Sequence, residues 1–174
     1  MLKFNKKTNV KKIHISVDKY VPLTVNFSDS INSELYWRTG DGISSLLEIG
    51  LLKSGELNSI TLVCFENSNI NLEIKKINEI KIFESAFPIF DTSLWISEII
   101  EYRDTFLDNF SENFTIQLLD NILFISFLKK GTSLKLIGSD EIVFGINESE
   151  ELSLIVMKNL SNEMIETLHN YYSF

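Results

Sequence analysis

Apolar and polar residues alternate along most of this chain, and the clearest alternation lies within Tyr36–Phe65. Leu47, Ile49 and Leu51 fall on one side of an extended chain, which is the two-residue period of a β-strand. Lys53–Glu56 then interrupts the apolar pattern with the small and polar residues that favour a chain reversal. Because the alternation resumes afterwards, the pattern predicts a β-hairpin here, around which the rest of the chain is expected to be organised.

Shorter runs of the same kind predict strands before and after this hairpin. Asp120 and Asn121 separate two of these runs as a two-residue turn typical of a hairpin. Pro22 marks a sheet edge or the entry to a strand, because proline has no N–H to donate. The expected strands are Lys12–Val17, Val21–Phe27, Ile70–Ile74, Ile80–Phe83, Phe114–Leu119, Ile122–Leu128, Leu134–Ile137, Ile142–Ile146 and Leu152–Met157.

Two segments have the spacing of an amphipathic helix. Ser161 is expected to cap a C-terminal helix whose apolar stripe is Leu160, Met164, Leu168 and Tyr172. Large apolar side chains recur at helical spacing in Trp95–Phe110 and predict one more helix around residues 95–110. The preceding segment, Ala86–Trp95, contains a proline and is expected to be an irregular apolar crossing. The predicted fold class is α+β, mainly antiparallel β-sheet of hairpins and a meander.

Length and composition are consistent with one domain. A chain of 174 residues, of which 44% are hydrophobic, can bury a substantial core, and no composition break divides it. No apolar run reaches the roughly 20 residues of a membrane span, and no signal-peptide segment follows the basic start, so we expect a cytoplasmic protein. Cys64 is the only cysteine, which excludes an intrachain disulfide, and its apolar neighbours predict a buried thiol.

Charge is distributed unevenly along the chain. The formal net charge is −8, yet Met1–Tyr20 holds six lysines against the single carboxylate of Asp18, so the remainder is more acidic still. Residues 1–11 are expected to form a flexible basic start and not a nucleic-acid arm, because they contain no arginine. An acidic body repels nucleic acids and attracts basic proteins, although solubility alone would also explain it.

Residue types offer little catalytic chemistry. His14 and His169 have no second His or Cys at metal-ligand spacing, and no nucleophile elbow or phosphate-binding glycine loop is present. We therefore predict neither an enzyme nor a cofactor, although a hydrolase built on two facing carboxylates would be visible only in three dimensions. Arg38 lies near Asp41 and Glu48 in the sequence, so it is expected to pair with a carboxylate or, alternatively, to contact a ligand or partner.

Acidic residues recur every three or four positions from the predicted second helix onward. In a helix they would form one negative stripe, which is either ordinary solvated surface or a surface shaped to cover a basic nuclease cleft. The stripe consists of Glu98, Glu101, Asp104, Asp108 and Glu112.

The segments Tyr36–Asp41, Ser45–Gly50 and Ser59–Leu62, with Gly55 between them, resemble the immunity proteins of bacterial contact-dependent growth inhibition systems, which are encoded beside polymorphic toxins. The similarity continues through Phe87–Trp95, Ile142–Ile146 and the helix start at Asn159–Ser161.

This resemblance implies a cytoplasmic inhibitor that binds the C-terminal domain of its cognate toxin, commonly a basic nuclease. It would do so by covering the active site or by strand or hairpin pairing. The residues expected to contact the partner are those of the acidic stripe, together with Asp41 and Trp95. A non-catalytic adaptor or a small-ligand-binding β-rich module is the alternative, and no membrane or direct nucleic-acid contact is predicted.

Overall fold

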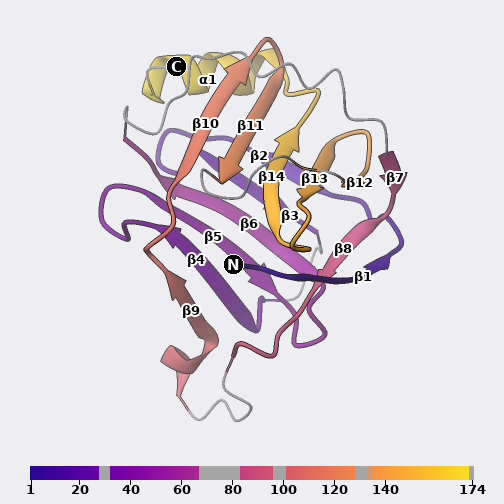
Figure 1. The fold of residues 1–174 in the computed structure, drawn as a ribbon. Coiled ribbons are helices and arrows are strands. Elements are labelled where there is room, and N and C mark those ends of the chain that lie inside the picture. The colour runs from indigo at the N-terminus through magenta and orange to yellow at the C-terminus, as the bar shows by residue number, and fades with distance from the viewer. Residues whose placement is uncertain (28–31, 67–82, 96–100, 128–132, 134, 173–174) are drawn as a thin grey trace.

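The computed structural model describes residues 1–174 except 28–31, 67–82, 96–100, 128–132, 134 and 173–174. The described strands form two six-stranded sheets and a two-stranded ribbon (Figure 1). The first sheet has the order β2 (His14–Ser16), β3 (Leu23–Asn26), β6 (Leu57–Cys64), β5 (Leu46–Leu51), β4 (Leu35–Gly40) and β9 (Phe106–Asn109). The second has the order β10 (Phe114–Leu119), β11 (Ile122–Phe127), β14 (Leu152–Met157), β13 (Ile142–Ile146), β12 (Lys135–Gly138) and β7 (Phe83–Ser85). With the C-terminal helix, this confirms the α+β class.

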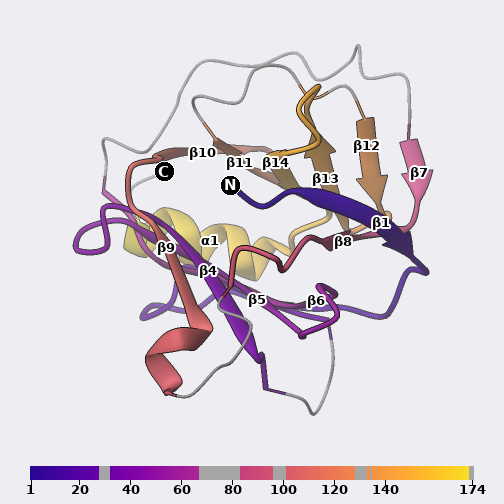
Figure 2. The same ribbon diagram turned by 60° about the horizontal axis from the view of Figure 1, so that its bottom comes forward.

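The two sheets lie as layers with a common core between them (Figure 2). Alternate residues of each strand point inward, as the period of a strand requires. Trp37 of β4 is fully buried, and its ring meets that of Phe127 of β11 edge to face, with ring centres 5.8 Å apart. The ring of Phe27, after β3, lies tilted against that of Phe144 of β13, with ring centres 6.3 Å apart. These contacts join the two layers into one hydrophobic core.

A ribbon of β1 (Phe4–Thr8) and β8 (Phe87–Phe90) connects the two sheets. The N–H of Phe90 donates to the carbonyl of Gly55 in the β5–β6 turn at 2.9 Å. The N–H of Phe4 donates to the carbonyl of Glu150, before β14, at 2.7 Å, and Leu2 beside it is fully buried. Phe4–Thr8 of the basic start therefore form a strand that is bonded directly to the second sheet and, through β8, to the first.

Helix α1 (Asn162–Tyr172) lies at the end of the molecule where β10 turns into β11 (Figure 1), and the N–H of Leu160, just before it, donates to the carbonyl of Asn121 in that turn at 3.1 Å. Ser161 caps it as predicted, since its Oγ accepts the N–H of Met164 at 3.3 Å. Leu168 is fully buried in the core, and the hydroxyl of Tyr172 donates to the carbonyl of Asp18 at 2.8 Å. The predicted apolar stripe is thus the face that attaches the helix to the rest of the protein.

Most predictions from alternation are confirmed. The central hairpin forms from β5 and β6, and Phe114–Leu119, Ile142–Ile146 and Leu152–Met157 are strands at the expected bounds. Asp120 occupies the two-residue turn with a φ of 53°, the left-handed conformation that such turns require. The strand predicted at Ile70–Ile74, and Ile80–Phe83 except for its last residue, lie outside the described residues.

The helix predicted around residues 95–110 is wrong where the structure describes the segment. Tyr102–Thr105 is a short 3₁₀ helix, η3, and the next four residues form β9, which pairs in parallel with β4. Ala86–Trp95 is likewise not wholly irregular, since Phe87–Phe90 is strand β8. In β8 and β9, hydrogen bonding to a distant segment outweighs the local pattern.

Cys64 was predicted to be buried, and the structure shows it only partly buried.

Candidate partner-binding surface

The outer face of the first sheet carries a group of rings and charges at its β9 edge. We name Tyr36, Arg38, Tyr102, Phe106, Asp108 and Phe110 the aromatic edge cluster. The parallel register of β4 and β9 places Phe106 beside Tyr36 and Asp108 beside Arg38. Because side chains two residues apart share a face of a strand, both pairs point to the same side.

The members of the aromatic edge cluster are stacked on one another. The rings of Tyr36 and Phe106 lie nearly parallel with centres 5.1 Å apart, and Tyr102 meets Phe106 edge to face at the same distance. The guanidinium carbon of Arg38 lies 4.2 Å from the centre of the Phe106 ring and 6.0 Å from that of Phe110. Its Nε and Nη2 donate to the two oxygens of Asp108 at 2.7 and 2.9 Å. A guanidinium group held by two rings and one carboxylate in this way has little freedom to move.

The cluster is ordered and yet reaches solvent. Tyr102 is 72% exposed and Phe110 is 42% exposed. Two large rings at this exposure on adjoining elements leave apolar area available to a partner.

Carboxylates surround these rings. Residues 36–48 and 101–112 together contain six carboxyl groups and two guanidinium groups, so the region is negative. Glu48 lies opposite Arg38 in the β4–β5 register. Partial burial raises the pKa of Glu48, and the nearby Arg38 opposes that rise. Burial also raises the pKa of Tyr36, and the charge of Glu48 adds to the effect.

Asp41 is exposed, and its carboxylate organises the turn between β4 and β5. Oδ1 accepts the N–H groups of Ile43, Ser44 and Ser45 at 2.8, 2.8 and 2.9 Å, and the hydroxyl of Ser44 donates to Oδ2. These donors, that hydroxyl first, hold the pKa of Asp41 far below its ordinary value. The carboxylate that we expected to contact a partner therefore first fixes the shape of its own loop.

Trp95, another predicted contact, lies inside the protein. Its side chain is only 7% exposed, and Nε1 donates to the carbonyl of Thr105 at 3.0 Å. Trp95 therefore attaches the start of this segment to Thr105 in the protein interior. The rings of the segment that reach solvent are those of Tyr102 and Phe110.

The predicted acidic residues do not form one helical stripe. Glu101 directly precedes η3 and Asp104 lies within it, and Arg103 Nε lies 2.9 Å from the Glu101 carboxylate. Asp108 pairs with Arg38, which confirms that this arginine binds a carboxylate, although Asp41 and Glu48 had been the nearer choices in sequence. The remaining two residues differ: Glu112 is partly buried and its carbonyl accepts from β4, whereas Glu98 lies outside the described residues. The carboxylates that are described thus lie around the β9 edge.

Sequence reasoning missed the aromatic members of this surface. The spacing of Phe106 and Phe110 within Trp95–Phe110 had predicted a helix. The alternation of Phe106, Asp108 and Phe110 with other residues was the signal for a strand with these three side chains on one face.

Two features are absent from the part of the chain that the structure describes: a metal site and a membrane-spanning helix. No group of three or more His, Cys, Asp or Glu residues is placed to hold a metal ion. Among the same residues, no helix is long and apolar enough to cross a membrane. Comparison with models of protein families and with curated proteins finds no match.

Proposed function

We propose that this chain is an immunity protein, a non-catalytic cytoplasmic inhibitor that binds the basic C-terminal domain of a cognate toxin, a nuclease, and covers its active site. The observation that supports this most is the aromatic edge cluster, an ordered and exposed group of rings and one arginine among carboxylates. The proposal also rests on the resemblance of the central hairpin and its flanking strand to such immunity proteins.

The composition of the cluster suits tight protein binding. Tyrosine and arginine are enriched among the residues that contribute most to protein interfaces. Here Arg38 is already held by Asp108 and Phe106 before any partner arrives. A side chain ordered in advance loses less conformational entropy on binding, so more of the contact energy becomes affinity.

The carboxylates supply selectivity for a basic partner. Complementary charge accelerates encounter and disfavours neutral or acidic proteins, and salt weakens the effect. Strand β9 also ends its sheet within the described structure, so a strand or hairpin of the partner could extend the sheet beside the cluster. Such pairing would place main-chain hydrogen bonds next to the aromatic contacts.

The test measures binding to the C-terminal domain of the toxin that is encoded directly beside this chain. Isothermal titration calorimetry is expected to give a tight complex that weakens as salt rises, and co-expression is expected to protect cells from that domain. Tyr102→Ala, on η3, is expected to weaken binding by about 30-fold, which is typical of a residue central to an interface.

Tyr171→Ala is the matched control. Tyr171 is an exposed tyrosine on α1, away from the β9 edge, and its removal is expected to leave affinity unchanged. Failure of the wild-type chain to bind or to protect would overturn the proposal.

A further inference from the structure

The turn next to the aromatic edge cluster presents an unusually exposed aliphatic side chain. Ile43 is 90% exposed, the highest value among the large hydrophobic residues of the described chain. It lies between Gly42, over which the ring of Phe110 is placed, and Ser44. A Cβ atom on Gly42 would lie only 2.9 Å from Cζ of Phe110, so the glycine lets ring and turn approach closely. Ile43 and Phe110 are therefore parts of one apolar projection.

The turn that carries Ile43 also approaches the end of strand β6. The Sγ of Cys64, at the end of β6, lies 3.9 Å from the carbonyl oxygen of Ile43. We name Ile43 and Phe110 the Ile43 knob.

The backbone that carries Ile43 is held firmly. Besides the four donors to the Asp41 carboxylate, the N–H groups of Asp41 and Gly42 donate to the carbonyl of Ser45 at 3.0 and 3.1 Å. Gly42 adopts a φ of +75°, which residues with a side chain rarely adopt. An exposed isoleucine on so constrained a turn needs little further ordering on binding.

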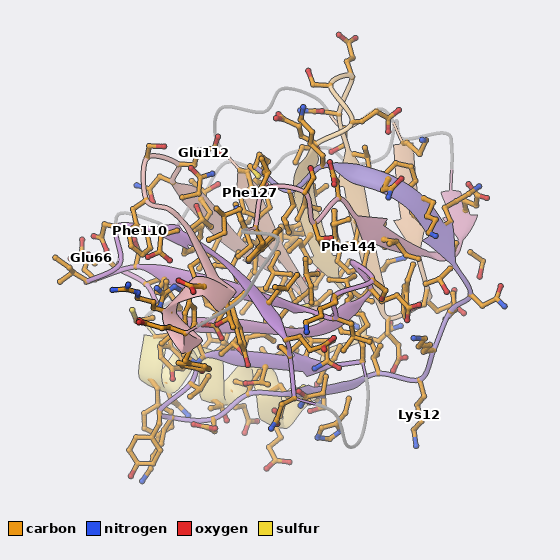
Figure 3. All side chains as sticks on the ribbon, turned by 90° about the horizontal axis from the view of Figure 1, so that it is seen from below. Lys12, Glu66, Phe110, Glu112, Phe127 and Phe144 are labelled. Atoms are coloured by element: carbon orange, nitrogen blue, oxygen red, sulfur yellow. The ribbon has the colours of Figure 1, made fainter. Side chains whose placement is uncertain are left out.

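The charges around the knob indicate what kind of surface it fits. Figure 3 shows Phe110 on the same side of the molecule as Glu66 and Glu112, with Lys12 on the opposite side. Asp41 adds a further carboxylate at the base of the turn. A complementary surface would have an apolar depression to receive Ile43 and lysine or arginine side chains around it.

We propose that the Ile43 knob inserts into an apolar pocket with a basic rim on the toxin domain, and that Ile43 is the anchor of this contact. The inference rests on the proposed function, because it concerns the same partner. It adds the specific residue and the shape of the partner's site. The aromatic edge cluster then lies alongside the anchor as the second part of the interface.

The test compares Ile43→Ala and Ile43→Asp with the wild-type chain in titration calorimetry against the toxin domain encoded beside it. Ile43→Ala is expected to weaken binding about 10-fold and Ile43→Asp about 100-fold or more, because the pocket would have to accept a carboxylate. Both variants are expected to keep the urea midpoint of the wild type, since the side chain is 90% exposed. Val10→Asp, at another exposed aliphatic residue, is the control and is expected to bind like the wild type.

A second pair of variants tests the role of the turn. Asp41→Asn and Asp41→Ala both remove the charge, but only asparagine retains an oxygen that can accept the N–H groups of the turn. Asp41→Asn is therefore expected to bind more tightly than Asp41→Ala. Equal affinity of these two variants would contradict the importance of a fixed turn.

Two negative results are distinguishable. If both Ile43 variants bind within about threefold of the wild type while Tyr102→Ala weakens binding, the anchor is wrong and the proposed function stands. If the wild-type chain does not bind the toxin domain, the proposed function itself fails, and the anchor with it.

Discussion

Replacement of Arg38 by methionine tests whether the aromatic edge cluster is held in place by its central cation. Methionine keeps a long apolar side chain, so the change removes the guanidinium group and retains much of the packing of the stem. It deletes the hydrogen bonds of 2.7 and 2.9 Å to Asp108 and the stacking on Phe106 at 4.2 Å.

The expected loss of stability follows from these contacts. The side chains of Arg38 and Asp108 are 26% and 40% exposed, so solvent limits the ion pair to about 0.5–1 kcal/mol. Stacking of the guanidinium group on Phe106 contributes about 0.5–1 kcal/mol more at such a site. Arg38→Met is therefore expected to lower the free energy of unfolding by about 1–2 kcal/mol.

Urea unfolding of a double-mutant cycle separates the two contributions. The cycle comprises the wild type, Arg38→Met, Asp108→Asn and the double variant. The coupling energy between the two positions is expected to be about 0.5–1 kcal/mol, and Arg38→Met alone is expected to cost more than that because it also loses the stacking. A loss below about 0.3 kcal/mol for Arg38→Met would refute the reasoning, since the rings would then be ordered without the cation.

Three further predictions concern stability. Burial raises the pKa of Glu48, so the wild type should lose stability relative to Glu48→Gln as pH rises past the carboxylate's ordinary pKa of 4.5. Urea midpoints of both proteins at about pH 4 and about pH 7 measure this change. A stability difference between the two proteins that stays the same at both pH values would contradict the prediction. Gly55 has a φ of +83°, and a Cβ atom added there would lie 1.9 Å from the carbonyl oxygen of Phe90. Gly55→Ala should therefore destabilise the protein by about 2–4 kcal/mol in the same assay. An unchanged stability of this variant would mean that the β8 attachment readily shifts. Trp95→Phe removes the hydrogen bond to Thr105 from a buried site and should cost about 1–3 kcal/mol; calorimetric melting tests this, and an unchanged melting temperature would show that the bond contributes nothing.

Tight turns between alternating runs were predictable because their information is local. The reversal at Lys53–Glu56 and the turn at Asp120 and Asn121 lie where residue types place them, and the strands on either side follow from a period of two. The cap at Ser161 is equally local, since its Oγ and the N–H that it binds are three residues apart. Elements whose partners are close in sequence can thus be predicted without knowledge of the tertiary structure.

The candidate surface was only partly predictable, because its contacts join distant segments. Arg38 and Asp108 are seventy residues apart, and the choice of Asp108 over the nearer Asp41 and Glu48 depends on the pairing of β9 with β4. Asp41 was selected as a contact, yet the structure shows its oxygens bound within the turn. The exposure of Ile43 was not predicted, since nothing in the local sequence distinguishes an exposed isoleucine from a buried one.

The sequence alone determined the class of fold, the central hairpin, the capped helix and the acidic character of the chain, because each depends on neighbouring residues or on composition. Only the tertiary structure decided that Phe106–Asn109 is an edge strand, that the first residues fasten both sheets, and which rings reach solvent. The spacing of Phe106 and Phe110 suits a helix as well as a strand. Hydrogen bonding and packing against β4, seventy residues earlier in the chain, decide between them.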